Sequence, residues 1–202
     1  MKVAAYQIRL SACRSIDAIP RIAEKVRWCE LNGVDVLCCP EGALGGLADY
    51  VPVPADIAVS VESGQLLTLL RPLVSDHVTT ILGFTELGSE GLLYNSAAIL
   101  HRGTVHGVYR KLHPAINKSV YAAGDQRPVF TRSNVTFGIL LCRDSMFSEP
   151  ARTMASQGAT RCSSQPTLGS RQARPGRNSS TKLVPSMWHE RWRTLRSSSG
   201  LT

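Results

Sequence analysis

The chain lacks several features that would assign it at once to a simple class of protein. Its six cysteines form no CxxC pair and no Cys/His spacing typical of a structural zinc site, so we do not expect a zinc module. No apolar run approaches the roughly 20 residues that a membrane helix needs, and the N-terminus shows no signal-peptide pattern. These absences predict a cytoplasmic protein with free thiols, and they argue against a membrane partner.

Acidic residues are nearly absent from the end of the chain. Residues 161–202 hold eight basic side chains and one acid, Glu190, whereas residues 1–160 hold 15 Lys/Arg and 14 Asp/Glu. The tail therefore supplies +7 of the net charge of +8, and residues 1–160 supply +1. The tail also lacks an aromatic ladder, since Trp188 and Trp192 are its only aromatic residues. We expect no specific nucleic-acid partner, while nonspecific polyanion binding stays open.

Apolar periodicity predicts strands that alternate with helices over residues 1–160. Helical spacing of apolar side chains runs from Ile19 to Cys29. A second helix should begin at Ser63 as N-cap, and a third should run from Ser148 to Gly158. Strands are expected at residues 3–8, 36–39, 79–84, 96–100, 105–109 and 137–141. With 43% hydrophobic residues, this order favours one α/β layered domain with a mixed sheet.

The amino-acid composition changes at Thr160. Residues 161–202 contain nine serines and seven arginines with no sustained apolar periodicity. We therefore expect a boundary between a globular domain, residues 1–160, and a basic, irregular, exposed tail, residues 161–202. Two hypotheses for the tail are a shifted reading frame and a natural basic extension.

Three reactive side chains follow three of the expected strands. Glu41 comes after residues 36–39, Lys111 after residues 105–109, and Cys142 after residues 137–141. The carboxyl ends of strands are where sites collect in open α/β sheets. A thiolate is a nucleophile, a carboxylate can move protons, and a cationic lysine can stabilise an oxyanion. Together they predict covalent acyl transfer.

The sequence segments around these residues resemble those of a known family. Residues 38–43 (CCPEGA), 109–113 (YRKLH) and 140–144 (LLCRD) resemble, in order, the three signature motifs of the nitrilase superfamily of carbon-nitrogen hydrolases. The resemblance extends to residues 3–7 (VAAYQ), 94–97 (YNSA) and 124–125 (GD), and covers about residues 1–160.

This resemblance implies a fold and a mechanism. The fold is an αββα sandwich, whose second half we expect to be incomplete here. Glu41 would take the proton of Cys142 as sulfur attacks a nonpeptide C–N centre, and Lys111 with the backbone N–H of Arg143 would hold the oxyanion. The substrate would be a small amide, carbamoyl compound or nitrile, and no metal or organic cofactor is called for. Relatives pair through a helix placed like residues 148–158, which implies a homo-oligomer.

Two positions depart from the family pattern. Many relatives carry a second glutamate four residues before an aromatic, and here Asn117 takes that place before Tyr121. An amide can hydrogen-bond to Lys111 or to a substrate but brings no charge. Relatives also place a buried apolar strand after the helix that follows the cysteine, and residues 160–165 (TRCSSQ) are too polar for us to expect it. The chain as written is therefore expected to be insoluble or a poor enzyme.

Two other readings of the sequence stay open. His113 could pair with Cys142 in a cysteine peptidase, although that leaves Glu41 and Lys111 unexplained. Alternatively, the chain could be an inactive fragment that serves only as an interaction or nonspecific nucleic-acid-binding protein.

Overall fold

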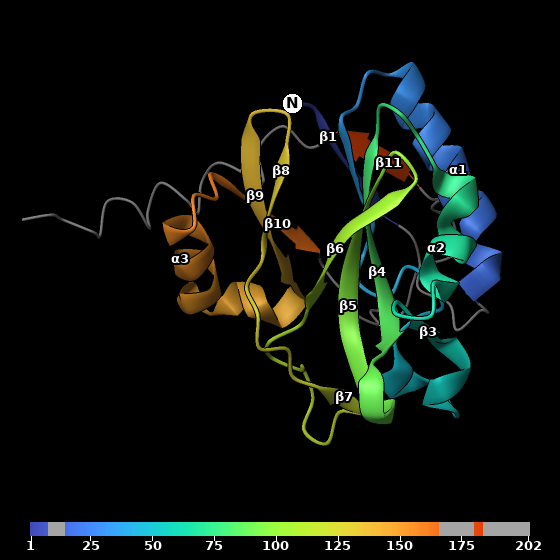
Figure 1. The fold of residues 1–202 in the computed structure, drawn as a ribbon, viewed down its shortest axis with the longest axis vertical. Helices are drawn as coiled ribbons and strands as arrows, with labels where there is room; N and C mark the ends of the chain where they lie inside the picture. The colour runs from blue at the N-terminus through green and yellow to red at the C-terminus, as the bar shows by residue number, and fades with distance from the viewer. Residues whose placement is uncertain (8–14, 166–179, 184–202) are drawn as a thin grey trace, which may run out of the picture.

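Two β-sheets packed face to face form the centre of the molecule. The computed structural model describes residues 1–7, 15–165 and 180–183. Helices α1 (Ser15–Leu31) and α2 (Gln65–Leu70) cover the outer face of the larger sheet, and α3 (Ser148–Ser156) covers that of the smaller one (Figure 1). The arrangement is an αββα sandwich, as the sequence predicts.

The larger sheet has the strand order β11-β1-β2-β4-β5-β6, with β3 paired to β4 and β7 paired to β5. Strands β1, β2 and β4 are mutually parallel, β5 is antiparallel to β4, and β6 is antiparallel to β5. Strands β2, β4 and β6 therefore end at the same edge. The bounds are β1 (Val3–Gln7), β2 (Val36–Cys38), β3 (Ala58–Ser60), β4 (Thr79–Leu87), β5 (Leu93–His101), β6 (Thr104–Arg110), β7 (Tyr121–Ala122) and β11 (Ser180–Leu183).

Burial on both faces explains the long apolar runs of the central strands. Residues 79–86 of β4 are all buried, because one face meets α1 and α2 and the other meets the second sheet. Ile22 and Val26 of α1 pack with Leu82 on the helical side. Ile81 lies in the second cluster, between the sheets. Alternate residues of β4 thus pack into two different hydrophobic clusters, one on each face of the sheet.

The smaller sheet has the order β10-β9-β8, formed by β8 (Val129–Arg132), β9 (Val135–Leu141) and β10 (Arg161–Gln165). Strand β9 lies in the middle. Gly138 lets α3 approach, because a Cβ there would lie 2.3 Å from the sulfur of Met154. The residues on either side, Phe137 and Ile139, pack toward the larger sheet.

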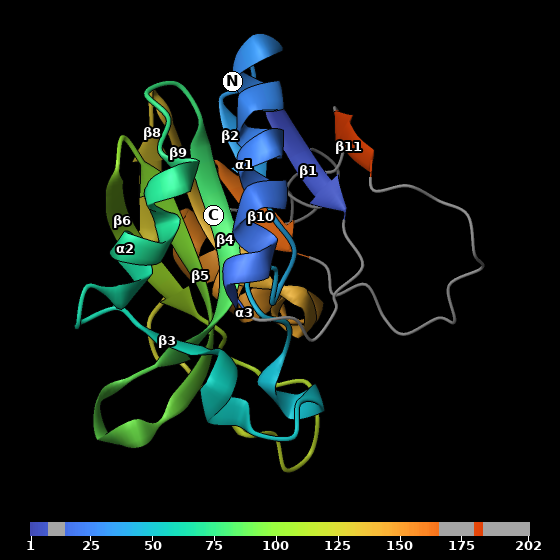
Figure 2. The same ribbon diagram turned by 90° about the vertical axis from the view of Figure 1, so that its right-hand side faces the viewer.

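The expectation of an irregular tail is wrong for its first five residues. Arg161–Gln165 form β10, which pairs in parallel with β9 and leaves β9 with neighbours on both sides. The ladder uses backbone groups, so side-chain polarity does not prevent it. The buried hydroxyl of Ser163, 2% exposed, meets the Cys38 sulfur at 3.3 Å, which satisfies it. Ser180–Leu183 also form a strand, β11, beside β1 (Figure 2). The rest of the tail lies outside the described residues.

The N-caps of two helices each differ by one residue from the sequence prediction. Gly64 is the N-cap of α2, and Ser63 instead accepts a hydrogen bond from the N–H of Gln65 at 3.4 Å. Phe147 is the N-cap of α3, so Ser148 is its first residue. Short 3-10 helices are η1 (Ala48–Tyr50), η2 (Pro54–Ile57), η3 (Arg71–Leu73), η4 (Ser89–Gly91) and η5 (Cys142–Met146). None of the helices described is long and apolar enough to cross a membrane.

Candidate active site

A buried ion pair joins two of the predicted site residues. Glu41 follows β2 and Lys111 follows β6, at the shared carboxyl edge of the larger sheet. The Lys111 Nζ donates a hydrogen bond to Glu41 Oε1 at 2.5 Å. Glu41 is 1% exposed and Lys111 is 2% exposed. A buried pair of this kind is costly to desolvate and is retained only where geometry supports it.

Strand β4 supports the turn that carries Glu41. The N–H of Cys39 bonds to the Ile81 carbonyl at 2.8 Å, and the N–H of Leu44 bonds to the Gly83 carbonyl at 3.0 Å. A Cβ on Gly83 would lie 2.5 Å from the Pro40 carbonyl oxygen. Gly83 therefore lets the Glu41 turn lie directly on the sheet.

Two backbone hydrogen bonds fix Lys111. Its N–H bonds to the Asn95 carbonyl at 2.8 Å, which extends the β5–β6 ladder by one residue, and its carbonyl accepts from the Gly124 N–H at 2.8 Å. A Cβ on Gly124 would lie 2.5 Å from the Arg110 carbonyl oxygen. Residues 124–125 resemble the family pattern, and the structure shows that Gly124 holds the Lys111 backbone.

Asn95 is a site residue that sequence reasoning missed. Its Nδ2 donates to Glu41 Oε1 at 2.7 Å, so this oxygen accepts from Asn95 and Lys111 together. The other carboxylate oxygen, Glu41 Oε2, is buried and has no hydrogen-bond partner among the described residues. Glu41 is thus held by one oxygen and keeps the other free to accept a proton.

Cys142 occupies a strained turn directly after β9. Its φ of +42° lies in the left-handed region, which non-glycine residues adopt at a cost of order 1–2 kcal/mol. Cys142 opens the 3-10 helix η5 and is partly exposed, unlike the buried Cys29, Cys38 and Cys39. A strained, accessible thiol at a strand end fits a nucleophile better than a packing residue.

The Asp144 carboxylate ties the Cys142 turn to the loop after Lys111. Asp144 is fully buried and accepts hydrogen bonds from the Tyr109 hydroxyl at 2.8 Å and from both the backbone N–H and Nδ1 of His113 at 2.9 Å. Burial, and then the nearby Asp144, raise the pKa of Tyr109, so its hydroxyl stays protonated and donates. Asp144 lies two residues after Cys142 and His113 two after Lys111, so the network joins the Cys142 turn to the loop that follows Lys111.

The Arg143 side chain also joins the Cys142 turn to the loop after Lys111. Its Nη1 donates to the Ala115 carbonyl at 2.9 Å and to the Pro114 carbonyl at 3.3 Å. Its backbone N–H lies in the first turn of η5, where a helix offers no internal acceptor. This position suits the expected role of an oxyanion donor, which stays a prediction.

Asn117 does not lie at Lys111, one of the two hydrogen-bond partners predicted for its amide. Asn117 is exposed, in a loop where Lys118 has a φ of +59°. Lys111 is met by Glu41 and by the backbone of Asn95, and no hydrogen bond of Asn117 is found in the described part of the chain. The loop turns outward after His113, so spacing from Tyr121 did not fix the direction of this side chain.

Comparison with known proteins shows the family of this chain. The family model described as carbon-nitrogen hydrolase matches residues 2–201. The chain belongs to the carbon-nitrogen hydrolase family. An (R)-stereoselective amidase from Pseudomonas sp. is 31% identical over 62% of this chain and 45% of its own length. A formamidase from Bradyrhizobium sp. (strain ORS 278) is 25% identical over 76% of this chain and 48% of its own.

Solved structures of the nitrilase superfamily share the fold of this chain. An amidase from Nesterenkonia sp. superposes with a TM-score of 0.69 at 22% identity, covering 85% of this chain and 66% of that one. Nit3 of Saccharomyces cerevisiae gives 0.70 at 18% identity, covering 84% and 65%. The chain spans about half the length of the curated relatives that it matches.

Proposed function

We propose that this chain carries the catalytic groups of a hydrolase that cleaves nonpeptide carbon-nitrogen bonds through a thioester on Cys142. The observation that carries the proposal is the buried Glu41–Lys111 pair, in which Glu41 keeps one oxygen without a partner among the described residues. Asp144 ties the strained, accessible Cys142 turn to the loop that follows Lys111. The matched relatives include an amidase, formamidases and nitrilases, which supports a small amide or a nitrile as the substrate. A carbamoyl compound is the third class that the family resemblance implies.

For an amide, the first half-reaction forms the thioester. The Cys142 thiol gives its proton to Glu41 Oε2 while sulfur bonds to the carbonyl carbon, and the carbonyl π electrons move to oxygen. Lys111 uses one of its three N–H donors on Glu41, which leaves two for this oxyanion, and the Arg143 N–H is a further donor. The C–N bond then breaks, and nitrogen takes the proton from Glu41 and leaves as ammonia or an amine.

The second half-reaction releases the acid. Water gives a proton to Glu41 as its oxygen bonds to the thioester carbon, and the C–S bond breaks. The proton returns from Glu41 to the Cys142 sulfur, which restores the starting state. No group other than those already described is needed for the proton balance.

Intact-mass spectrometry tests the proposal. The chain is incubated with a panel of short aliphatic amides, and we expect an acyl adduct that peptide mapping places on Cys142. Glu41→Gln should slow adduct formation at least about 10²-fold, because it removes the base. Lys111→Ala should slow it about 10²- to 10³-fold, because it removes an oxyanion donor. Far-UV circular dichroism confirms that each variant folds.

A surface ion pair provides matched controls. Glu24 and Lys25 are joined at 2.9 Å on α1, away from the strand ends, with the Glu24 side chain 65% exposed. Glu24→Gln and Lys25→Ala therefore make the same chemical changes outside the site and should leave the adduct rate within about twofold. An adduct on another cysteine, or equal rates in Glu41→Gln and Glu24→Gln, would refute the assignment. No adduct with any amide would favour the inactive-fragment hypothesis.

The cysteine-peptidase alternative rests on the His113–Asp144 pair. His113 Nδ1 meets Asp144 at 2.9 Å, as the orienting bond of a peptidase dyad would require, but the His113 ring stacks on Phe147 at 4.1 Å. Among the described contacts of Cys142, none is a hydrogen bond to His113. We expect His113→Gln to retain adduct formation with amides, whereas a peptidase would lose it.

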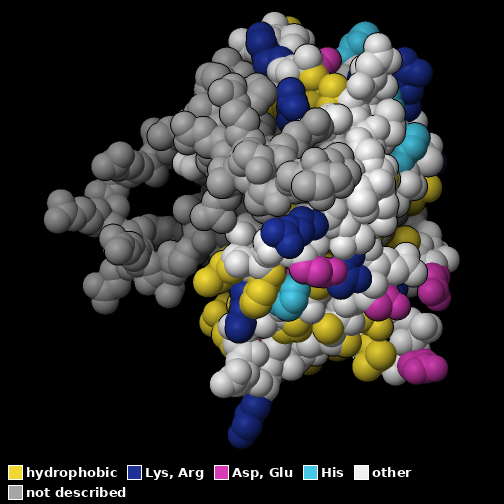
Figure 3. All heavy atoms as spheres, turned by 90° about the vertical axis from the view of Figure 1, so that its left-hand side faces the viewer, with side chains coloured by type: hydrophobic (Ala, Val, Ile, Leu, Met, Phe, Trp, Pro, Cys, Tyr) yellow, Lys and Arg dark blue, Asp and Glu magenta, His cyan; other side chains and the backbone are white. Residues whose placement is uncertain are grey.

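We also propose a cytoplasmic homo-oligomer. Free thiols at five cysteines support the compartment. Exposed apolar side chains at η5 and in the loop after Lys111 support self-association, and hydrophobic side chains gather on the face that bears α3 (Figure 3). Met146 is 79% exposed and Val120 42% exposed. Light scattering of Met146→Ser should show a smaller particle than the unchanged chain.

A further inference from the structure

A second cavity lies between the two sheets, away from Cys142. It has a volume of about 200 Å³ and is bounded by the whole of β8, the end of β5, the start of β4, and parts of β6 and β9. Phe137 of β9 borders it, and the five residues from Phe137 to Cys142 span about 17 Å of extended chain. The cavity is therefore separate from the site described above, at the opposite end of β9.

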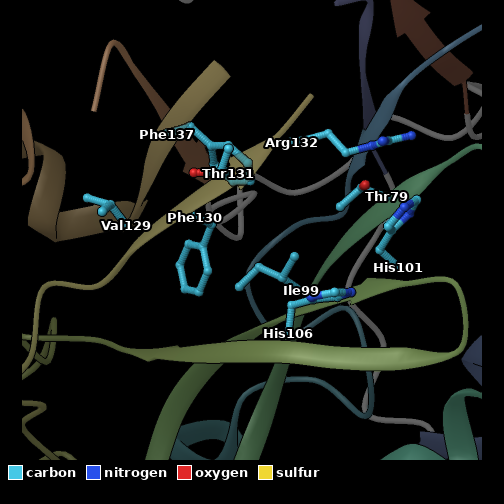
Figure 4. Close-up of a pocket in the computed structure, with 9 residues that line it drawn as sticks. All are labelled: Thr79, Ile99, His101, His106, Val129, Phe130, Thr131, Arg132 and Phe137. Atoms are coloured by element: carbon cyan, nitrogen blue, oxygen red, sulfur yellow. The ribbon is translucent and has the colours of Figure 1, made fainter. Parts of the chain in front are cut away.

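Polar and apolar groups take opposite sides of this cavity. Figure 4 shows the Arg132 guanidinium, the Thr79 hydroxyl and the His101 ring on one side, with Phe130 and Val129 on the other. No acidic side chain is among the residues that line it. Arg132 therefore brings a positive charge without a carboxylate in the same cavity, and Phe130 brings a flat apolar surface.

Three polar atoms on the polar side lack partners. Thr79 Oγ1, His101 Nδ1 and Arg132 Nε are each buried with no hydrogen-bond partner among the described residues. Thr79 is 2% exposed, and such unmet hydroxyls are uncommon in native proteins. Arg132 Nη2 is anchored on the His77 carbonyl at 2.9 Å, which holds the guanidinium in place while Nε stays unpaired. Burial, and then the neighbouring Arg132, lower the pKa of His101, so Arg132 supplies the charge.

We propose that this cavity is a binding site for a small carboxylate with an aromatic or branched apolar body, its carboxylate on Arg132 and Thr79 and its body against Phe130. An arginine matches a carboxylate in charge and in planar geometry. A cavity of about 150 Å³ accepts a benzene ring, so one of about 200 Å³ suits a ligand near the size of benzoate. His106 and Thr131, both exposed, lie at the open side through which such a ligand enters.

Calorimetric titration with benzoate tests the site on the full chain. Cys142 is first alkylated with iodoacetamide and a single adduct is confirmed by mass, so the candidate active site cannot account for the signal. We expect saturable benzoate binding to the alkylated protein and at least tenfold weaker binding of toluene, which lacks the carboxylate. This result does not depend on whether the chain hydrolyses amides.

Three variants locate the ligand. Arg132→Gln should weaken benzoate at least about tenfold. Arg102→Gln removes the same charge from an exposed position in the adjacent β5–β6 turn and should change affinity less than twofold. Thr79→Val removes an unpaired buried hydroxyl, so it should raise the melting temperature yet weaken benzoate about two- to tenfold.

The proposal fails if benzoate does not bind, if alkylation of Cys142 abolishes binding, or if toluene binds as tightly. It also fails if Arg132→Gln leaves the affinity unchanged. Should Arg132→Gln not fold, the Thr79→Val variant decides, because an unchanged affinity there removes the proposed carboxylate contact.

Discussion

Replacing Asp144 by asparagine should destabilise the protein by about 3 kcal/mol. The carboxylate accepts three hydrogen bonds of 2.8–2.9 Å, from Tyr109 and twice from His113. The least costly asparagine places its oxygen toward His113 and its NH₂ toward the Tyr109 hydroxyl, which can rotate to accept. These three bonds survive, but each changes from charge-assisted to neutral and loses about 1 kcal/mol, which gives about 3 kcal/mol. The long 3.4 Å contacts from the N–H groups of Leu112 and Leu141 to Oδ2 are lost as well, so this value is a lower bound.

Urea unfolding followed by circular dichroism measures this change. A loss of about 3 kcal/mol corresponds to a fall in melting temperature of about 6–12 °C for a chain of this length. Tyr109→Phe removes one of the three bonds and should cost about 1–2 kcal/mol, less than Asp144→Asn. Asp56→Asn makes the same chemical change at an exposed position and should stay within about 0.5 kcal/mol. If Asp144→Asn matches the Asp56→Asn control, the reasoning about this network is wrong.

Three further outcomes are expected. Burial raises the pKa of Cys38 from 9.0 to about 11, so the thiol of the unfolded chain loses its proton at a lower pH than that of the folded chain. The free energy of unfolding should therefore fall between about pH 9 and 11, and urea titrations of Cys38→Ala should show a flatter pH dependence. Gly83→Ala should cost about 1–3 kcal/mol by pressing on the Pro40 carbonyl and should slow acyl-adduct formation; an unchanged melting temperature would contradict it. Asn95→Asp should be less stable than Asn95→Ala at pH 8, because it places a second carboxylate next to that of Glu41. Urea unfolding measures both variants, and a more stable Asn95→Asp would argue against the contact between Asn95 and Glu41.

The sequence predicts the strand ends well because burial on both faces leaves a clear apolar run. Glu41 and Lys111 meet as their positions after β2 and β6 imply. Asn95 could not be placed by counting back from the hairpin turn, since a register shift lies between Ile99 and Leu100. Without the shift, Asn95 would face Arg110, one residue away from its observed neighbour Lys111.

Contacts between loops are less readable from the sequence than strands. Asp144 belongs to a motif that resembles the family, yet its partner His113 lies 31 residues away across two sheets, and no local pattern reports such a pair. Arg161–Gln165 forms a strand against expectation, because pairing with β9 and one sulfur contact to Ser163 outweigh its polar composition. The contact with Lys111 predicted for Asn117 is not observed, for a related reason. Sequence spacing locates a residue within a loop but does not give the direction of its side chain.

A second buried glutamate in the same sheet shows why Glu41 is read as a functional group. Glu86 is 3% exposed, and both of its oxygens are satisfied: Oε1 accepts from Arg110 at 2.7 Å, and Oε2 accepts from Arg110 at 3.1 Å and from Ser96 at 2.6 Å. This is what a structural carboxylate requires, because an unmet buried oxygen costs about 1–3 kcal/mol. Glu41 has equal burial and a tighter cationic partner, yet its Oε2 is left without a partner among the described residues. Both carboxylate oxygens of Glu86 are hydrogen-bonded, whereas at Glu41 the free-energy cost of an unpartnered oxygen remains. Such a cost is expected where a carboxylate must accept a proton during a reaction.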